Sequence, residues 1–388
     1  MRVSYNWLRE YVPIELSPNE LGEKLTMAGI EVEEIINLRA SYDSLKVGKI
    51  IDIQPHPQAD NLLICQVKVT DGEITIITAA KNLKSGDKVP LVLPGSTLPD
   101  GREIYETQFH GIVSQGMLCS EEELGLARKS EGILVLPANT DLTADLASIL
   151  GLDDYVLMIE LTPNRADCYG MLGIAREVSA LTGVNLKLPA CAVNEIREAI
   201  TNFATVEVLD PELCPRYAGR VFLDVKVGES PLWLKARLLA AGMRSINNLV
   251  DLTNYVMLEL NQPLHPFDLK QLKEQKIIVR PARKNEVITT LDGEERTLSG
   301  GQLVIADPYH AQCIAGVMGS YQSEVSGATD TVFLESAYFL PVSIRRTAQA
   351  LAIRSEAAIR FGKGLDPETV PLALDRLLIW LRSYRLRE

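Results

Sequence analysis

The stretch from Val47 to Leu136 limits the possible folds of this chain more than any other part of the sequence. Its apolar residues come in short runs, and turn signals separate these runs at Asp71-Gly72, Ser85–Asp87 and Pro99–Gly101. Short strands at this spacing predict a small barrel or sandwich, and an OB-type barrel suits a segment of this size. The residues on either side of the segment must then form other domains.

Helical signals precede and follow this strand-rich segment. Ser17 to Glu20 fits a capping box with proline at the first helical position, and Gly29 can end that helix. Further along, Asp167 is a candidate N-cap for a second helix that ends at Gly183. We therefore predict a small α/β N-terminal domain of residues 1–39 and 154–195, with the OB-type barrel inserted as residues 40–153.

After a proline-containing linker from Leu188 to Ala192, strand and helix patterns mix. Apolar runs near 204–210, 219–227, 276–282, 286–293, 302–307 and 331–337 predict strands, and 231–242 and 372–386 predict helices. This mixture predicts an α+β domain over residues 200–388. The predicted fold class is therefore an α+β multidomain protein.

The overall charge and the cysteines exclude several classes of protein. A net charge of -12 over 388 residues argues against a protein that coats nucleic acid by bulk electrostatics, although a local basic site stays possible. The six cysteines are scattered and form no CxxC pair, which favours reduced thiols over a zinc site or a disulfide framework. Because the sequence shows neither a signal peptide nor a membrane-spanning apolar run, we expect a cytoplasmic protein without a membrane partner.

The segment from Arg244 to Asp268 predicts a helix with an unusual polar face. Ser245 is a candidate cap, and Asn247, Asp251 and Asn254 recur at the spacing that places them on one face. A solvent face usually carries Lys, Arg and Glu, but no Lys or Arg occurs between Arg244 and Lys270. Amides beside one carboxylate favour a polar pocket wall or a buried network. The alternative is an amide-rich structural helix.

Three further features accompany this helix. His265 follows it in a loop that two prolines stiffen, and the small residues from Ala315 to Gly319 would let a ligand approach the backbone. Glu335 closes an apolar strand, where an unpaired carboxylate would be costly, so a protein partner or a ligand hydroxyl should satisfy it. The alternatives are a structural histidine, a plain turn and a structural salt bridge.

The strand-rich segment resembles a known family. The strings His56 to Leu62 and Ser114 to Leu126 are similar to the tRNA-binding barrel of phenylalanyl-tRNA synthetase beta subunits and related tRNA-binding proteins, and Glu160 to Cys168 resembles the beta subunit just after that barrel. The resemblance implies tRNA binding. The segment has more acidic than basic residues, however, and few aromatic residues on which bases could stack. A structural barrel that contributes weak or no contacts to RNA is the alternative.

Four strings in the second half resemble the editing domain of the same beta subunit: Arg244 to Asp268, Ile314 to Ser320, Thr331 to Ala337 and Ala352 to Phe361. In that family the domain hydrolyses tyrosine wrongly attached to the phenylalanine tRNA. The resemblance implies that Glu335 binds the tyrosine hydroxyl. It implies catalytic roles for His265, Thr253 and Asn254, and substrate-binding roles for Glu335, Ala315, Gly316, Gly319, Ser355 and Ala357. The chain departs from the family pattern at Asn261, Pro266, Ser320 and Gly362.

The resemblance also implies partners and cofactors. The expected partners are tRNA(Phe) and, in the full enzyme, the synthetase alpha subunit. Editing needs no cofactor and no metal, whereas ATP and Mg²⁺ serve only the full synthetase. The family's later modules have no counterpart in this sequence, so we expect the N-terminal part of the beta subunit, active as an editing hydrolase but not in aminoacylation alone. The alternative is a non-catalytic tRNA-binding or assembly module that works only within the complete synthetase.

Overall fold

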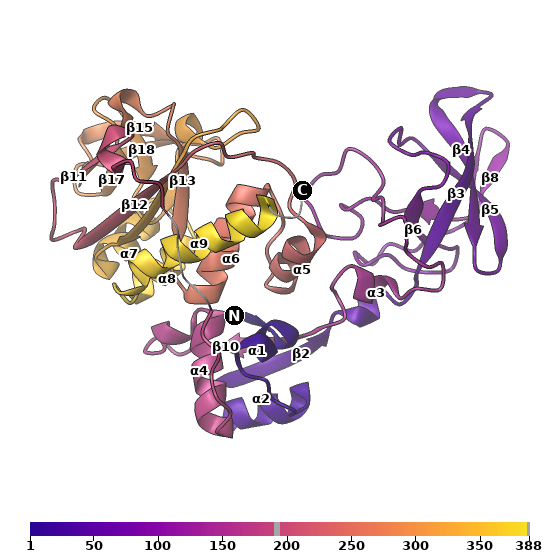
Figure 1. Cartoon of the computed structure of the whole chain (residues 1–388), viewed down its shortest axis with the longest axis horizontal. Helices are drawn as coiled ribbons and strands as arrows, with labels where there is room; N and C mark the ends of the chain where they lie inside the picture. Colours follow the sequence, from indigo (N-terminus) through magenta and orange to yellow (C-terminus); the bar gives the residue numbers. More distant parts are fainter. Residues whose placement is uncertain (190–194, 386–388) are drawn as a thin grey trace.

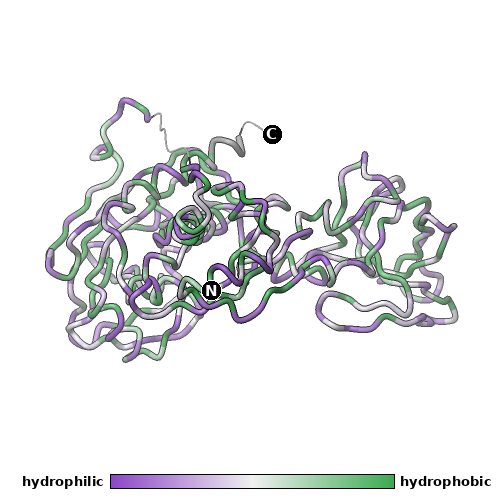
Figure 2. Tube along the Cα trace, turned by 90° about the horizontal axis from the view of Figure 1, so that it is seen from below, coloured by the Kyte–Doolittle hydropathy of each residue, from purple (hydrophilic) through white to green (hydrophobic). Residues whose placement is uncertain are grey.

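The computed structural model describes residues 1–189 and 195–385. The strand-rich segment forms a lobe at the right of Figure 1, and the first and last parts of the chain form a larger body. The same two lobes remain separate when the molecule is seen from below in Figure 2. Part of the predicted linker from Leu188 to Ala192 lies outside the described residues. No described helix is long and apolar enough to cross a membrane.

The N-terminal part combines a three-stranded antiparallel sheet, in the order β1-β10-β2, with three helices. Its elements are β1 (Arg2–Ser4), α1 (Tyr5–Tyr11), α2 (Pro18–Met27), β2 (Glu31–Asn37), β10 (Tyr155–Glu160) and α4 (Met171–Thr182). The capping box is confirmed, because Ser17 and Glu20 each bind the other's backbone N–H. The predicted cap at Asp167 is wrong: α4 begins after Gly170, and Asp167 lies in a short 3₁₀ turn. Gly183 does end α4 in the left-handed conformation.

The strand-rich segment forms a five-stranded antiparallel sheet in the order β5-β4-β3-β6-β9. Its elements are β3 (Leu45–His56), β4 (Ala59–Val69), β5 (Gly72–Thr78), β6 (Lys88–Val92), β7 (Thr107–Phe109), β8 (Ile112–Ser114), β9 (Met117–Leu118) and α3 (Leu146–Ile149). Strands β7 and β8 pair as a separate hairpin. The predicted strands are therefore present, but the structure corrects one feature of the expected barrel.

The sheet does not close into a barrel through a strand ladder among the described residues. Its edges β5 and β9 approach each other, and the backbone N–H of Gln115 donates to the carbonyl of Thr75 over 2.8 Å. Side chains take the neighbouring positions: Ser114 Oγ accepts from the Ile77 N–H over 3.0 Å, and Gln115 Oε1 accepts from the Thr75 N–H over 3.1 Å. Because these side chains satisfy the free edge of β5, a continuous ladder is not needed there.

The C-terminal part contains three sheets and five helices within the described residues. The sheet orders are β11-β14-β17-β18-β19, β12-β20-β13 and β15-β16. The strands are β11 (Thr205–Val208), β12 (Arg216–Phe222), β13 (Leu264–Asp268), β14 (Lys276–Pro281), β15 (Lys284–Thr289), β16 (Glu295–Ser299), β17 (Leu303–Ala306), β18 (Ala311–Ile314), β19 (Met318–Gly319) and β20 (Val332–Tyr338). The helices are α5 (Leu232–Ala240), α6 (Asn248–Leu260), α7 (Pro341–Ala350), α8 (Glu356–Lys363) and α9 (Thr369–Arg385).

Strand β13 replaces the stiffened loop that was predicted around His265. The prediction rested on Pro263 and Pro266, because proline fixes its backbone φ angle and so stiffens a loop. In the structure β13 lies at the edge of its sheet and pairs only with β20 among the described strands, so a proline N is tolerated there. His265 is therefore held by strand pairing.

The β12-β20-β13 sheet lies between two hydrophobic cores. One face contributes Phe222, Leu334 and Leu264 to a core shared with α1, α4, α5, α6 and α9. The other face contributes Phe333, Phe267 and Ala337 to the core of the second half. Because one core includes residues from both ends of the chain, the first and last predicted domains are not packed independently. The exact domain boundaries remain a prediction.

Candidate functional site

A cleft of about 1330 Å³ lies between the strand-rich segment and the body of the molecule. The loop 127–132 forms one wall, and α6 and β13 form the facing wall, with Thr253, Asn254 and His265 among the lining residues. All three predicted catalytic residues are therefore brought together. The six residues predicted to bind substrate are not among the lining residues of this cleft.

Helix α6 is anchored at its N-terminus by a polar network. Asn247 caps the helix, because its side chain accepts from the N–H groups of Leu249 and Val250. The predicted cap, Ser245, instead donates its hydroxyl to the buried carboxylate of Asp251, which also accepts from Ser230 Oγ and the backbone N–H at position 246. The predicted polar face thus has two parts: Asp251 belongs to a buried network, and Asn254 belongs to the cleft wall.

Thr253 and Asn254 differ in their free hydrogen-bonding capacity. The Thr253 hydroxyl donates to the Val250 carbonyl over 2.7 Å, so its proton is already engaged within the helix. Asn254 is half-buried, and its amide makes no hydrogen bond with the described residues. Asn254 is therefore the residue of this pair that can offer both a donor and an acceptor to a ligand.

His265 lies at the cleft on the edge strand β13, directly opposite Glu335 on β20. Burial lowers the pKa of its imidazole from 6.5 to about 4, so the ring is neutral at pH 7. Gly319 approaches the ring so closely that a Cβ there would lie 2.4 Å from His265 Cε1. Gly319 thus contacts a predicted catalytic residue, and a larger residue at this position would displace the ring.

Glu335 lies one strand farther into the sheet and is buried. The hydroxyl of Tyr217, on β12, donates to Glu335 Oε2 over 2.9 Å. Burial raises the pKa of the carboxyl from 4.5 to about 8, and this hydrogen bond offsets part of the rise. No ion pair involves Glu335 within residues 1–189 and 195–385, so the salt-bridge alternative is not found there. The partner that we expected for Glu335 within the protein is therefore the neutral hydroxyl of Tyr217.

The sequence analysis missed Tyr217, which lies more than a hundred residues before Glu335. A local signal was present in Gly219, because glycine inside a strand often marks a close approach. In the structure Gly219 pairs with Glu335, and a Cβ at Gly219 would lie 2.0 Å from the ring of Phe333. The identity of the partner could not be found from this signal, because it depends on the register between β12 and β20.

The remaining predicted residues gather around the turn between β18 and β19. Ala315 and Gly316 are buried, and Gly316 takes a left-handed φ of 67° against Phe339 and Phe361. Ser355 caps α8, and its hydroxyl donates to the Val317 carbonyl over 2.7 Å, while Ala357 packs beside the second core. These contacts hold the turn that carries Gly319. Whether these residues touch a substrate stays a prediction.

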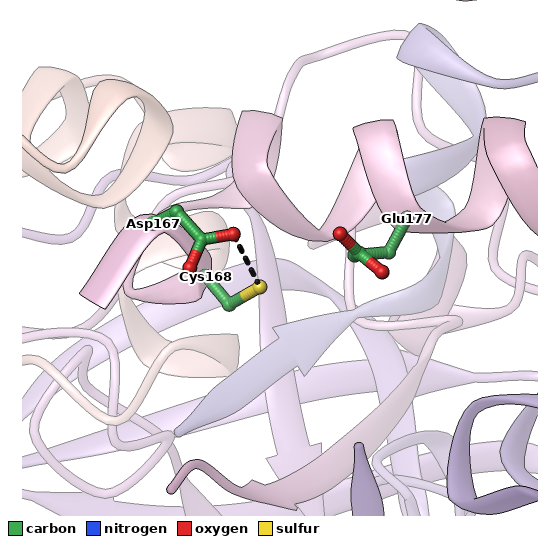
Figure 3. A group of neighbouring side chains, drawn as sticks. All are labelled: Asp167, Cys168 and Glu177. Carbon is green, nitrogen blue, oxygen red and sulfur yellow. Dashed lines mark hydrogen bonds between the residues drawn. The ribbon is translucent and has the colours of Figure 1, made fainter. Parts of the chain in front are cut away.

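A second polar cluster, Asp167, Cys168 and Glu177, has the composition of a metal site. Figure 3 shows Asp167 and Cys168 next to each other, with Glu177 facing them from α4. The guanidinium of Arg165 already contacts all three, at 2.8 Å from Asp167 Oδ2, 2.8 Å from Cys168 Sγ and 2.6 Å from Glu177 Oε1. Burial raises the pKa of the Cys168 thiol to about 12, which keeps it protonated. We interpret the cluster as an ion-pair network that anchors the start of α4.

Comparison with known families defines the class of protein first. Residues 45–145 match the family model described as a putative tRNA binding domain, and residues 213–385 match the model of the B3/4 domain. The first match covers the open five-stranded sheet, and the second covers the helix that carries Asn254 and the sheet that carries His265 and Glu335. The chain is therefore a protein that combines a tRNA-binding domain with a B3/4 domain.

Similarity to curated proteins then gives the particular family. The chain is 50% identical over 382 residues to the phenylalanine–tRNA ligase beta subunit of Moorella thermoacetica, and 46% identical over 376 residues to that of Syntrophus aciditrophicus. Each match covers 97% of this chain and 47% of the relative, so the chain spans about half the length of these relatives. The chain belongs to the phenylalanine–tRNA ligase beta-subunit family.

A distant structural similarity was also found. An N-terminal fragment of the phenylalanyl-tRNA synthetase beta subunit from Pyrococcus horikoshii matches 91% of this chain and 73% of that fragment, with 12% identity and a TM-score of 0.34. A likeness this weak adds nothing to the family assignment, which rests on the sequence matches.

Proposed function

We propose that this chain is the editing part of a phenylalanine–tRNA ligase beta subunit and hydrolyses Tyr-tRNA(Phe). The observation that carries the proposal is the pairing of His265 and Glu335 on adjacent strands: a neutral imidazole lies at the cleft, and a buried carboxyl with one neutral partner lies beside it. In the complete enzyme the partners are tRNA(Phe) and the synthetase alpha subunit. ATP and Mg²⁺ serve amino-acid activation there, and the editing reaction uses neither.

The reaction requires only water. The water oxygen adds to the ester carbonyl carbon, the bond between that carbon and the ribose oxygen breaks, and a proton from the water ends on the ribose oxygen. The products are tyrosine and tRNA with a free ribose hydroxyl. No oxidant, metal or covalent nucleophile is needed to balance this step.

His265 and Asn254 suit the positioning of that water. With a pKa of about 4, the His265 ring has one nitrogen that accepts and one that donates a hydrogen bond at pH 7. A base this weak accepts a proton poorly at pH 7, because efficient general bases have pKa values near the working pH. We therefore assign His265 the role of orienting water, and Asn254 the role of a second polar contact in the same cleft.

Glu335 suits the recognition of the tyrosine hydroxyl. Tyr217 occupies Oε2, and Oε1 forms no hydrogen bond with the described residues. A phenolic hydroxyl would pair with this free oxygen, whereas phenylalanine would leave a buried carboxyl oxygen without a partner. Sites built on this contrast can discriminate by up to roughly 10⁴-fold. An apolar pocket rejects an amino acid with an added hydroxyl only weakly. A second site that hydrolyses the wrong product is therefore useful.

The proposal is tested by measuring the release of tyrosine from Tyr-tRNA(Phe). We expect the native chain to hydrolyse the ester well above the uncatalysed rate, and His265→Ala to lower the rate by roughly 10²-fold because the water loses its orienting group. His310→Ala is the matched control, since His310 is exposed on a turn and should leave the rate unchanged. Release by the native, folded chain at the uncatalysed rate would reject the proposal. If salt-sensitive tRNA binding persisted in that case, the alternative of a non-catalytic tRNA-binding or assembly module would be favoured.

A further inference from the structure

Three strands bring their side chains to one face of a sheet around Glu335. In the register of the β12-β20-β13 sheet, Glu335 pairs with Gly219 on one side and with His265 on the other. Paired residues of neighbouring strands share a face, and so do residues two positions apart along one strand. Tyr217 therefore lies on the same face as Glu335, in the diagonal position, where its long side chain reaches the carboxyl.

Gly219 leaves the position directly opposite Glu335 free of a side chain. The ring of Phe333, two residues before Glu335, fills this space, since a Cβ on Gly219 would lie 2.0 Å from that ring. Phe333 and Tyr217 both pack in the core of the second half, so aromatic rings cover this side of the carboxyl. The carboxyl is not sealed, however, because Glu335 keeps 5% of its surface exposed.

The titratable groups that face Glu335 within the described residues are neutral at pH 7. Burial raises the pKa of the Cys214 thiol, just before β12, to about 12, and it holds the pKa of the Cys313 thiol, on β18, well above its usual value. Both thiols donate to backbone carbonyls. The His265 ring is neutral because burial lowers its pKa to about 4. The hydroxyl of Tyr217 is therefore the group that orients the carboxyl.

Tyr217 determines which oxygen of the carboxyl takes which role. Its hydroxyl donates to Glu335 Oε2 over 2.9 Å, and burial holds the pKa of Tyr217 well above 10, so the hydroxyl stays a donor at pH 7. A neutral carboxyl has one oxygen that accepts and one that carries the proton. A proton on Oε2 would leave the Tyr217 hydroxyl proton without an acceptor, whereas a proton on Oε1 keeps this hydrogen bond.

We propose that Tyr217 is a positioning residue for ligand selection: its hydroxyl fixes Oε2 of Glu335 as the acceptor, so that Oε1 meets the hydroxyl of a phenolic side chain. The inference rests on the proposed editing function, and it adds a residue of β12 to the groups that select the tyrosyl ester. Because the pKa of Glu335 is about 8, the carboxyl is mainly neutral at pH 7, and Oε1 donates its proton in a hydrogen bond to the phenolic oxygen. A phenyl ring offers no acceptor to this donor.

Selection is measured as binding, without hydrolysis, with two 3′-amino-3′-deoxyadenosine derivatives that carry tyrosine or phenylalanine through an amide in place of the ester. Isothermal titration calorimetry gives the ratio of the two dissociation constants. We expect Tyr217→Phe to lower the preference for the tyrosyl compound about fivefold, the size expected for the loss of one neutral hydrogen bond. Glu335→Gln should retain most of the preference, because its amide oxygen accepts from Tyr217 while its nitrogen donates to the phenol.

The pKa of Glu335 separates a positioning role of Tyr217 from a packing role. The hydrogen bond from Tyr217 holds this pKa below the value that burial alone would give. Tyr217→Phe should therefore raise the midpoint of the Glu335 titration above about 8, whereas a loosened core would admit water and lower the midpoint toward 4.5. Carbon-13 NMR of the side-chain carboxyls measures this midpoint, and the Glu335 signal is assigned by its absence in Glu335→Gln.

The matched control is Tyr309→Phe, which removes a tyrosine hydroxyl that donates to the Glu274 carboxylate over 2.9 Å at an exposed position and should change neither quantity. Thermal melting confirms that each variant is folded. An unchanged preference or a lowered midpoint in Tyr217→Phe would overturn the inference. Loss of the preference in Glu335→Gln, or equal affinity of the native chain for the two amides, would also overturn it. The predicted binding without any ester hydrolysis would reject the editing proposal alone.

Discussion

Two buried carboxyl groups in this molecule differ in how completely they are paired. Glu259, on α6, is fully buried and accepts two hydrogen bonds from Arg376, at 2.7 Å and 2.8 Å, and a third from the Tyr11 hydroxyl. Within the part of the chain that the structure describes, Glu335, on β20, accepts a single hydrogen bond, from Tyr217. A carboxylate with a cation and several donors is a structural element, whereas one with a single neutral donor keeps the capacity to bind something else.

The positions of the two carboxylates support this distinction. Glu259 joins α1, α6 and α9 through Tyr11 and Arg376, inside a group of stacked aromatic rings that includes Trp7 and Tyr255. Glu335 lies beside His265, which lines the cleft. The first site therefore holds the two ends of the chain together, and the second lies one strand behind the wall of the cleft.

The largest expected effect follows from breaking the fully paired site. Arg376→Ala leaves the Glu259 carboxylate buried without its cation, and we expect the free energy of unfolding to fall by about 3–5 kcal/mol. Urea denaturation monitored by tryptophan fluorescence measures the change. The exposed Arg346→Ala is the control, with an expected change within about 0.5 kcal/mol. A change of the same small size for Arg376→Ala would contradict the structural role assigned to Glu259.

A smaller, pH-dependent effect follows from Glu335. Its pKa of about 8 in the folded protein exceeds the ordinary value of 4.5, so the folded protein binds the additional proton between these pH values. The stabilisation is full below about pH 4.5 and is lost as the pH rises through about 8. Glu335→Gln removes this proton. The free energy of unfolding of the wild type minus that of the variant should therefore fall with rising pH, by up to about 1.4 kcal/mol per pH unit in this window. A pH-independent difference would mean that the carboxyl is not held protonated by burial.

His265 contributes with the opposite sign to the wild-type curve. Its pKa falls from 6.5 to about 4 on folding, so its stabilisation is present above about pH 6.5 and is lost as the pH falls through about 4. The two contributions oppose each other between about pH 4.5 and 6.5. The difference between wild type and Glu335→Gln isolates the Glu335 contribution, because His265 is present in both proteins.

Local signals allowed part of the fold to be predicted. The capping box at Ser17 and the left-handed Gly183 depend on residues within one helical turn, and both predictions are confirmed. The predicted strands of the strand-rich segment also occur. The predicted barrel is wrong in its closure, because side chains of Ser114 and Gln115, and not a strand ladder, bind the edge of β5, and no local pattern encodes these long-range contacts.

The sequence predicted a set of site residues, of which Thr253, Asn254 and His265 line one cleft, but it did not predict the geometry around them. The amide-rich pattern of α6 indicated a pocket wall or a buried network, and the structure places Asn254 at the cleft and Asp251 in a buried network, while the cap is Asn247 and not Ser245. The prolines beside His265 suggested a loop, whereas the edge position of β13 accommodates them in a strand. The Tyr217–Glu335 bond and the 127–132 wall come from long-range packing, which no local pattern encodes.

The central claim is that the incompletely paired Glu335 selects the tyrosyl ester, and the ratio of hydrolysis rates for Tyr-tRNA(Phe) and Phe-tRNA(Phe) tests it most directly. We predict that Glu335→Ala lowers this ratio by at least about tenfold, because the tyrosine hydroxyl loses its hydrogen-bond partner. Glu324→Ala, which removes an exposed carboxylate from the rim of the same cleft, should leave the ratio unchanged. An unchanged ratio in folded Glu335→Ala would contradict the account, since Glu335 would then be a buried structural carboxyl like Glu259.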